Sequence, residues 1–78
     1  PPNDGSMDIV IEFAKEVVIV EVKFNKKAID GLKQIKTKDY AKKYRSDRKK
    51  LTAVGLSVAI GRGATKKSCV VDVAHEAL

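Results

Sequence analysis

Two carboxylates and an amine stand in two β-branched segments near the N-terminus. Asp8 lies early in the segment 7–13, and Glu21 and Lys23 lie near the end of the segment 17–24. Side chains alternate between the two faces of a strand, so Glu21 and Lys23 share a face. Paired carboxylates are suitable ligands for Mg²⁺ or Mn²⁺, which also accept substrate oxygens. A metal there could polarise a phosphate and activate water, while the ammonium neutralises charge in the transition state.

A short hairpin turn would bring Asp8 to the same face as Glu21 and Lys23. A two-residue loop at 14–15 or 15–16 gives facing residues whose numbers sum to 29 or 31. Both sums place Asp8 on the face of Glu21 and Lys23. The opposite face is then apolar, and we expect it to pack under a helix. Its members are Ile9, Ile11, Phe13, Val18, Val20, Val22 and Phe24.

A purely structural interpretation of these residues is an exposed cross-strand ion pair, worth at most about 1 kcal/mol. The pattern Glu-x-Lys alone favours that interpretation, because it is common. Three features favour a site instead: an Asp on the same face, an apolar strand that Glu21 and Lys23 interrupt, and a basic segment directly after it.

The segment after Phe24 predicts a helix that starts at about Lys26, with Asn25 as its N-cap. Its apolar stripe is Ala28, Leu32 and Ile35. We expect this helix to pack on the apolar side of the hairpin and to kink or restart near 37–39. Gly31 would allow a close approach of the helix to the sheet.

The second half of the chain predicts two more strands. A polar connection at 45–50 leads to 51–60, which is apolar with little alternation and therefore belongs inside a sheet. A turn follows at 61–67, and 69–73 is a short last strand. The order strand, strand, helix, strand, strand predicts an α/β (α+β) fold with a mixed sheet and a right-handed crossover.

Composition limits the class of protein. The 78 residues suit one domain, with 1–6 as a linker, and 44% are hydrophobic, with no apolar run long enough to span a membrane. The single cysteine, Cys69, excludes an internal disulfide and fits a reducing compartment. We therefore expect an intracellular, cytoplasmic protein.

The net charge of +6 is concentrated between Lys26 and Lys50. Such a concentration favours a polyanionic partner, because each neutralised phosphate releases condensed counterions. A solvated helix face explains the same run equally well. The basic residues are Lys26, Lys27, Lys33, Lys36, Lys38, Lys42, Lys43, Arg45, Arg48, Lys49 and Lys50.

Other chemistries have little support in the sequence. Cys69 and His75 are single residues, so a zinc site is not expected, and His75 fits an exposed position near the C-terminus. Gly61-Arg62-Gly63 could offer amides and a guanidinium to a phosphate, although a hairpin turn explains it better.

Four ordered motifs resemble the PD-(D/E)XK nuclease superfamily, most closely its small domain that follows an AAA-type ATPase-like domain in bacterial proteins. The motifs are Gly5-Ser6-Met7-Asp8, Val20-Glu21-Val22-Lys23, Leu32-Lys33-Gln34-Ile35 and Asp39-Tyr40-Ala41-Lys42-Lys43-Tyr44. The resemblance implies that Asp8 and Glu21 bind Mg²⁺ or Mn²⁺ and that Lys23 is catalytic. It also implies that Gln34 approaches the site from the helix and that Tyr40 assists.

The chain departs from that family at its start. The superfamily has a helix and a strand before the strand of Asp8, and Met7 replaces the usual proline. The fold would then be a truncated restriction-endonuclease-like core with an exposed edge and apolar face. We expect either a fragment of a longer protein, with an upstream ATPase-like domain, or a homodimer that completes the sheet.

The resulting expectation is a Mg²⁺-dependent nuclease domain that hydrolyses DNA phosphodiester bonds with Asp8, Glu21, Lys23 and Gln34. The leading alternative is a noncatalytic nuclease-like module for nucleic-acid binding or protein assembly. In that case Lys36, Lys42, Lys43 and Arg45 would contact the nucleic acid. A third alternative is a protein-interaction domain whose basic run is only solvated.

Overall fold

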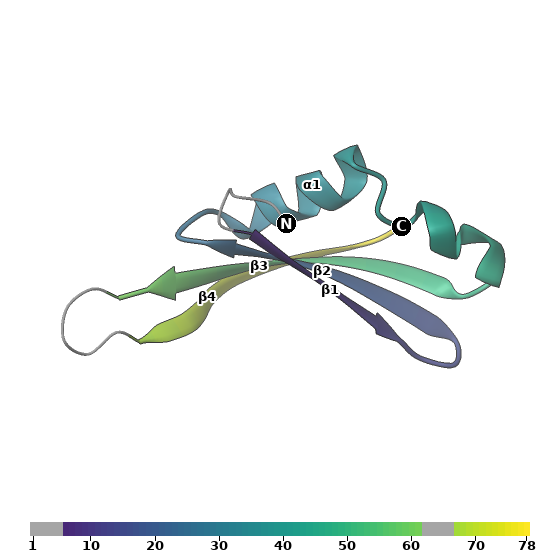
Figure 1. Cartoon of the computed structure of the whole chain (residues 1–78), viewed down its shortest axis with the longest axis horizontal. Helices are drawn as coiled ribbons and strands as arrows, with labels where there is room; N and C mark the ends of the chain where they lie inside the picture. Colours follow the sequence, from purple (N-terminus) through teal and green to yellow (C-terminus); the bar gives the residue numbers. More distant parts are fainter. Residues whose placement is uncertain (1–5, 62–66) are drawn as a thin grey trace.

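A four-stranded mixed sheet with one α-helix forms the protein, as the computed structural model shows for residues 6–61 and 67–78 (Figure 1). The expected element order is confirmed. The elements are β1 (Ser6–Glu12), β2 (Glu16–Phe24), α1 (Ala28–Thr37), the 3₁₀ helix η1 (Lys42–Asp47), β3 (Lys50–Ile60) and β4 (Ser68–Ala77). The strands lie in the order β1-β2-β3-β4. No helix in these described ranges is long and apolar enough to cross a membrane.

Strands β1 and β2 form the expected hairpin. Asp8 lies opposite Glu21, so the numbers of facing residues sum to 29. The amide of Phe13 donates a hydrogen bond to the carbonyl of Glu16, at 2.7 Å, and closes the two-residue loop. This register confirms that Asp8, Glu21 and Lys23 share one face of the hairpin.

Strand β3 lies between β2 and β4, which confirms its interior position in the sheet. It pairs in parallel with β2 and antiparallel with β4. Strand β4 extends to Ala77 and is longer than the expected 69–73, because its ladder with β3 continues as far as the pair Thr52 and Ala77. A register shift beside Ser57 and Val58 marks a bulge in this ladder.

The helix α1 covers the face of the sheet that carries Glu21 and Lys23, so the expectation that it packs on the opposite face is wrong. Its stripe of Ala28, Leu32 and Ile35 is buried, as predicted, but against the face of β2 that includes Ile19. The crossover between parallel strands is right-handed as a rule, so the connection decides which face the helix covers. Neither of the described helices covers the apolar face that was expected to be covered, although Val20 and Val22 on that face are each only 7% exposed.

The hydrophobic core lies between α1, η1 and the two central strands. From the sheet it takes alternate positions of β2 and β3, although β2 is buried without a break from Ile19 to Lys23 and only β3 alternates between buried and half-buried residues. The buried cluster contains Val17, Ile19, Leu32, Ile35, Ala41, Tyr44, Leu51 and Ala53.

Two glycines allow α1 to lie unusually close to the sheet. A Cβ on Gly55 would lie 2.1 Å from the carbonyl oxygen of Ala28, and a Cβ on Gly31 would lie 2.9 Å from the carbonyl oxygen of Glu21. Gly31 also faces Gly55 itself, because its Cβ would lie 3.2 Å from the Cα of Gly55. The backbone of the helix therefore rests on the backbone of β2 and β3 at the level of Glu21.

The ends of α1 differ in part from expectation. Asn25 was expected as the N-cap, but Lys27 takes that position. Asn25 has a φ of 56°, and its side-chain oxygen accepts a hydrogen bond from the amide of Ile60. The helix ends at Thr37 and a 3₁₀ helix follows, so the expected break near 37–39 is confirmed. Asp39 has a φ of 51°, the left-handed conformation common after a helix end.

Replacing Gly55 with alanine is expected to destabilise the fold by about 3 kcal/mol or more, because backbone atoms of α1 cannot rotate away from the new methyl group. Urea unfolding followed by circular dichroism measures the change. Gly61→Ala is the matched control, since its nearest atom lies at 3.4 Å and its effect should stay within about 0.5 kcal/mol. Equal destabilisation by the two substitutions would contradict the close contact of α1.

Candidate functional site

The residues proposed for chemistry meet between the sheet and α1. Glu21 is 0% exposed and Lys23 is 4% exposed, whereas Asp8, directly across the hairpin from Glu21, is exposed on the edge strand β1. An exposed cross-strand ion pair, the structural interpretation of the sequence pattern, does not describe a glutamate that is completely buried. The sheet register brings the two acids together, and α1 covers one of them.

A chain of hydrogen bonds connects β2 to α1 and to the segment after it. The Nζ of Lys23 donates to Oε1 of Gln34 at 2.5 Å, and Nε2 of Gln34 donates to the hydroxyl oxygen of Tyr40 at 2.9 Å. Both contacts are partly buried. Gln34 therefore approaches Lys23 from the helix, and its amide fixes the ammonium on one side and Tyr40 on the other.

Tyr40 completes the group on the side of the acids. Burial raises the pKa of its hydroxyl above the usual 10.0, and although the hydrogen bond from Gln34 lowers it, the negative charges of Glu21 and Asp8 raise it further, as does hydrogen bonding with Glu21. These interactions place the hydroxyl of Tyr40 in the field of both carboxylates. At neutral pH it is protonated and able to donate.

The turn after α1 holds Tyr40 in place. Asp39 accepts two hydrogen bonds from the guanidinium of Arg45, at 2.5 and 3.0 Å, so the pair spans the segment that contains Tyr40. Ala41 and Tyr44 in the same segment are buried in the core. Arg45 and the Lys42 charge together lower the pKa of Asp39, which keeps this carboxylate ionised.

The polar residues on this face suit a divalent cation that keeps part of its water shell. Mg²⁺ is usually bound by one or two carboxylates together with water and substrate oxygens. Asp8 and Glu21, in facing positions on adjacent strands, supply two carboxylates. Within the described ranges no group of three or more His, Cys, Asp or Glu residues could hold a metal ion. Two carboxylates are thus what the described residues offer to a cation at this place, so its remaining ligands would have to be water or substrate oxygens.

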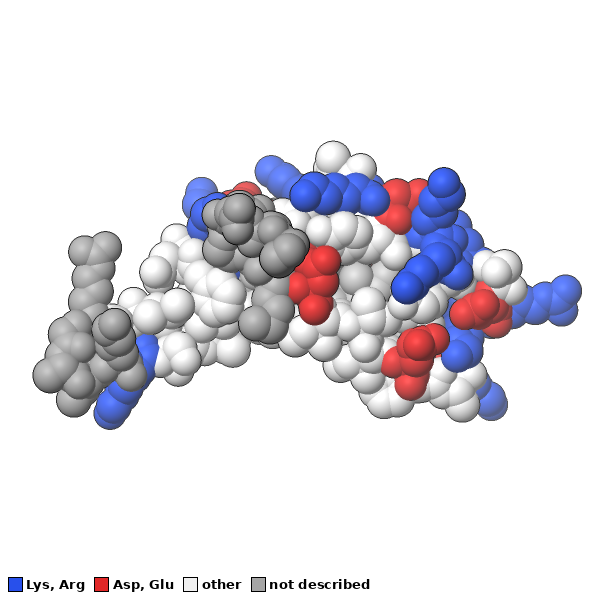
Figure 2. Space-filling model, viewed as in Figure 1, with Lys and Arg blue, Asp and Glu red and all other residues white. Residues whose placement is uncertain are grey.

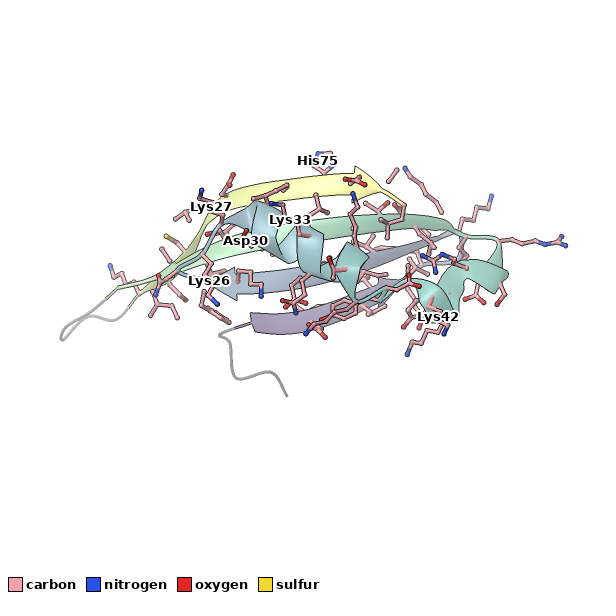
Figure 3. All side chains as sticks on the ribbon, turned by 90° about the horizontal axis from the view of Figure 1, so that it is seen from above. Lys26, Lys27, Asp30, Lys33, Lys42 and His75 are labelled. Atoms are coloured by element: carbon pink, nitrogen blue, oxygen red, sulfur yellow. The ribbon has the colours of Figure 1, made fainter. Side chains whose placement is uncertain are left out.

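The four basic residues expected to contact nucleic acid differ in their surroundings. Lys36 forms a 2.9 Å ion pair with Glu76 of β4, and Arg45 is paired with Asp39. Lys43 lies over the ring of Tyr44, 5.1 Å from its centre, and Lys42 is exposed. Lysine and arginine side chains gather over α1 and η1 (Figure 2), and those of Lys26, Lys27, Lys33 and Lys42 are labelled in Figure 3.

The histidine, the cysteine and the turn expected at 61–67 are the other features that the sequence singles out. His75 is exposed on β4, as expected, and Cys69 is an exposed free thiol. The amide of Gly61 donates a hydrogen bond to the carbonyl of Lys67, so the two ends of the turn expected at 61–67 lie together. The candidate phosphate contacts of Arg62 and Gly63 lie outside the described residues.

Comparison with known proteins gives one match. The family model of the PD-(D/E)XK nuclease superfamily matches residues 2–68, which contain all of the candidate site. Searches of the curated proteins and of the solved structures found no match.

The pKa of Tyr40 offers a direct test of this geometry. In a Tyr44→Phe background, in which Tyr40 is the single tyrosine, ultraviolet titration should give a pKa above 10, and Asp8→Asn should lower it by removing a negative charge. Because the pKa of Tyr40 is higher in the folded state than in the unfolded state, the contribution of its protonated hydroxyl to the free energy of unfolding is complete below pH 10. That contribution is lost as the pH rises through the pKa of Tyr40 in the folded state. Asp30→Asn is the control and should leave the titration unchanged.

Proposed function

The chain belongs to the PD-(D/E)XK nuclease superfamily, and we propose that it is a metal-dependent nuclease domain that hydrolyses DNA phosphodiester bonds. The observation that carries this proposal is the buried Glu21, opposite Asp8 and beside the hydrogen-bonded chain of Lys23, Gln34 and Tyr40.

Burial of Glu21 is costly to the fold and needs an explanation. Moving an ionised carboxylate out of water costs several kcal/mol unless other groups compensate it. A second carboxylate across the hairpin adds to that cost, because like charges repel. Buried, interacting acids of this kind are typical of functional sites, and a bound cation would compensate both charges.

Asp8 and Glu21 are the residues that would hold the metal ion. When bound, Mg²⁺ or Mn²⁺ polarises the phosphate and lowers the pKa of bound water. The exposed Asp8 lies at the solvent side of the pair, where a substrate phosphate can approach, and Glu21 lies at the inner side under α1.

Lys23 would supply a fixed positive charge next to the acids. Its ammonium is held by the amide oxygen of Gln34, so it needs little reorganisation to neutralise charge that develops on the phosphate. Gln34 acts as a positioning residue, because it connects Lys23 to the hydroxyl of Tyr40. Tyr40 remains protonated at neutral pH and can donate a hydrogen bond toward the acids.

Contacts with the DNA backbone would come from the basic layer of α1 and η1. Lys42 and Lys43 are exposed and lie shortly after Tyr40 in the chain. Lys36 and Arg45 are each half-exposed or more while paired with an acid, so they can also contribute to the positive field. Such contacts with phosphates add affinity without sequence preference.

The substitutions Asp8→Asn, Glu21→Gln and Lys23→Ala are each expected to reduce cleavage by about 100-fold or more, because each removes a charged group from the reacting centre. Cleavage of a DNA duplex and of a single strand in Mg²⁺ measures this. Matched substitutions outside the group and outside the basic layer, Glu12→Gln, Asp30→Asn and Lys67→Ala, should retain activity. Retained cleavage in all three site variants would exclude these residues as the catalytic group.

The metal is tested separately from activity. Mg²⁺ should raise the urea midpoint of the wild type, since a ligand of the folded state stabilises it. Asp8→Asn should remove that increase, and Glu12→Gln should keep it. An increase of the same size in Asp8→Asn would argue against metal binding by this pair.

A noncatalytic nucleic-acid-binding module is the second candidate, and the burial of the site favours it. Glu21 is fully buried and Lys23 nearly so, which limits access for a phosphodiester. The basic layer over α1 and η1 is accessible in either case (Figure 2).

For this second candidate, binding of DNA should weaken steeply with salt, in the absence of cleavage with any divalent metal. Each phosphate contact contributes about −0.9 to the slope of log K against log salt concentration. Lys42→Ala and Lys43→Ala should each reduce the slope by about one, and Lys67→Ala, on the opposite end of the sheet, should leave it unchanged. Fluorescence anisotropy over a range of salt concentrations measures the slope.

A further inference from the structure

Lys26 and Lys42 are exposed lysines at the two ends of the candidate site. Lys26 follows the end of β2, and Lys42 is the first residue of η1. Figure 3 looks down on α1 and shows both of them toward β1, whereas Lys27 and Lys33 lie toward β4. Glu21 belongs to the strand that runs between the two ends. The β1 side of α1 therefore has a lysine on either side of the acids.

The distance between the two ends is close to the length of β2. Tyr44 of η1 belongs to the same buried cluster as Val17, near the start of β2, and Lys26 comes shortly after Phe24, the last residue of β2. The path from Val17 to Phe24 is about 23 Å at about 3.3 Å per residue. One strand of B-DNA has a phosphate about every 3.4 Å along the axis, so roughly seven phosphates fit between the two ends.

The loop that carries Lys26 is fixed to β3 by three hydrogen bonds. The amide of Asn25 donates to the carbonyl of Val58 at 2.8 Å, and the amide of Ile60 donates to the side-chain oxygen of Asn25 at 3.0 Å. The hydroxyl of Ser57 donates to the carbonyl of Lys26 itself. The backbone of Lys26 is therefore held in position before any ligand binds, which lowers the entropic cost of a contact.

Acids compensate the lysines that lie toward β4. Lys36 forms its ion pair with Glu76 of β4. Asp30 is three positions from both Lys27 and Lys33, a spacing at which side chains of a helix are neighbours. The positive charge on this side of α1 is therefore partly neutralised within the protein.

The acids toward β1 are mainly those of the candidate site. In the described strands β1 and β2, the carboxylates on the α1 side are Asp8, Glu12 and Glu21. The metal ion of the proposed function would compensate Asp8 and Glu21, which leaves Glu12. A phosphate backbone is then attracted more strongly to the β1 side of α1 than to the β4 side.

The aromatic residues do not form a platform for unpaired bases. The chain has two tyrosines and two phenylalanines, and all four lie in the described ranges. Tyr44 is buried, Tyr40 is hydrogen-bonded to Gln34, Phe24 is half-buried, and Phe13 alone is exposed, in the hairpin loop. Proteins that hold single strands rely on stacking of successive bases, whereas a duplex offers about twice as many phosphates per length. The surface therefore suits a duplex.

We propose that Lys26 and Lys42 are the two anchoring points of a DNA duplex whose backbone lies along the β1 side of α1, across Asp8 and Glu21. The proposal rests on the proposed function for its ligand, DNA. It adds Lys26 to the residues that contact phosphate, and it excludes Lys27 and Lys33 from them.

The two anchoring points are tested by fluorescence anisotropy of a labelled duplex over a range of salt concentrations, in EDTA, so that binding is measured without metal-dependent cleavage. Lys26→Ala and Lys42→Ala should each lower the slope of log K against log salt concentration by about 0.9, and the double variant by about 1.8. Each single change should weaken binding about eightfold at about 0.1 M salt, which is the contribution of one phosphate contact. Lys27→Ala is the matched control, because it removes the same charge from the adjacent residue on the β4 side, and its slope should equal that of the wild type.

The outcomes separate this proposal from the proposed function. An unchanged slope in Lys26→Ala, an equal loss in Lys27→Ala, or tighter binding of a single strand than of the duplex would overturn the two-point duplex site alone. A wild type that binds no DNA would overturn both, whereas the expected slopes without cleavage in Mg²⁺ would support the site and refute only the nuclease activity. Lys26→Arg keeps the charge and should keep the wild-type slope. Loss of binding in this variant while circular dichroism shows it folded would assign Lys26 a different role and overturn the proposal.

Discussion

The contact of α1 with the sheet through Gly31 and Gly55 determines the rest of the structure. It brings backbone to backbone at the level of Glu21, where any side chain would separate the two layers. At this short distance Gln34 reaches the ammonium of Lys23 from the helix. The same contact buries Glu21, so one steric condition sets both the packing of the core and the polarity of the candidate site.

The local features of this fold could be predicted from the sequence. The β-branched runs and a two-residue loop define the hairpin and place Asp8 opposite Glu21, because the period of two leaves few registers. The face covered by α1 could not be predicted from polarity, since the more apolar face of β2 is the one that neither described helix covers. The connection between parallel strands decides that choice, and it depends on the chain geometry instead of the side chains.

The residues of the candidate site could be predicted from the sequence, but their burial and their contacts could not. The motif residues supplied Asp8, Glu21, Lys23 and Gln34, and the structure brings these positions together. Burial of Glu21 depends on Gly55, which lies 34 positions later and has no local signal in the sequence. Likewise the pairing of Arg45 with Asp39 depends on a turn with a left-handed residue, which a count of basic residues does not reveal.

The hydrogen-bonded chain of Lys23, Gln34 and Tyr40 also has a consequence for folding. All of the candidate polar groups come from residues 8 to 40, and the pairs Asp8–Glu21, Lys23–Gln34 and Gln34–Tyr40 join positions 6 to 13 apart in sequence, while Tyr40 and Glu21 are 19 apart. Closing such short loops costs little entropy, so the hairpin and helix can meet early. The parallel pairing of β2 with β3 spans 34 positions and is slower. We therefore expect the acids to gather while still in water and to lose their solvent only when β3 is added.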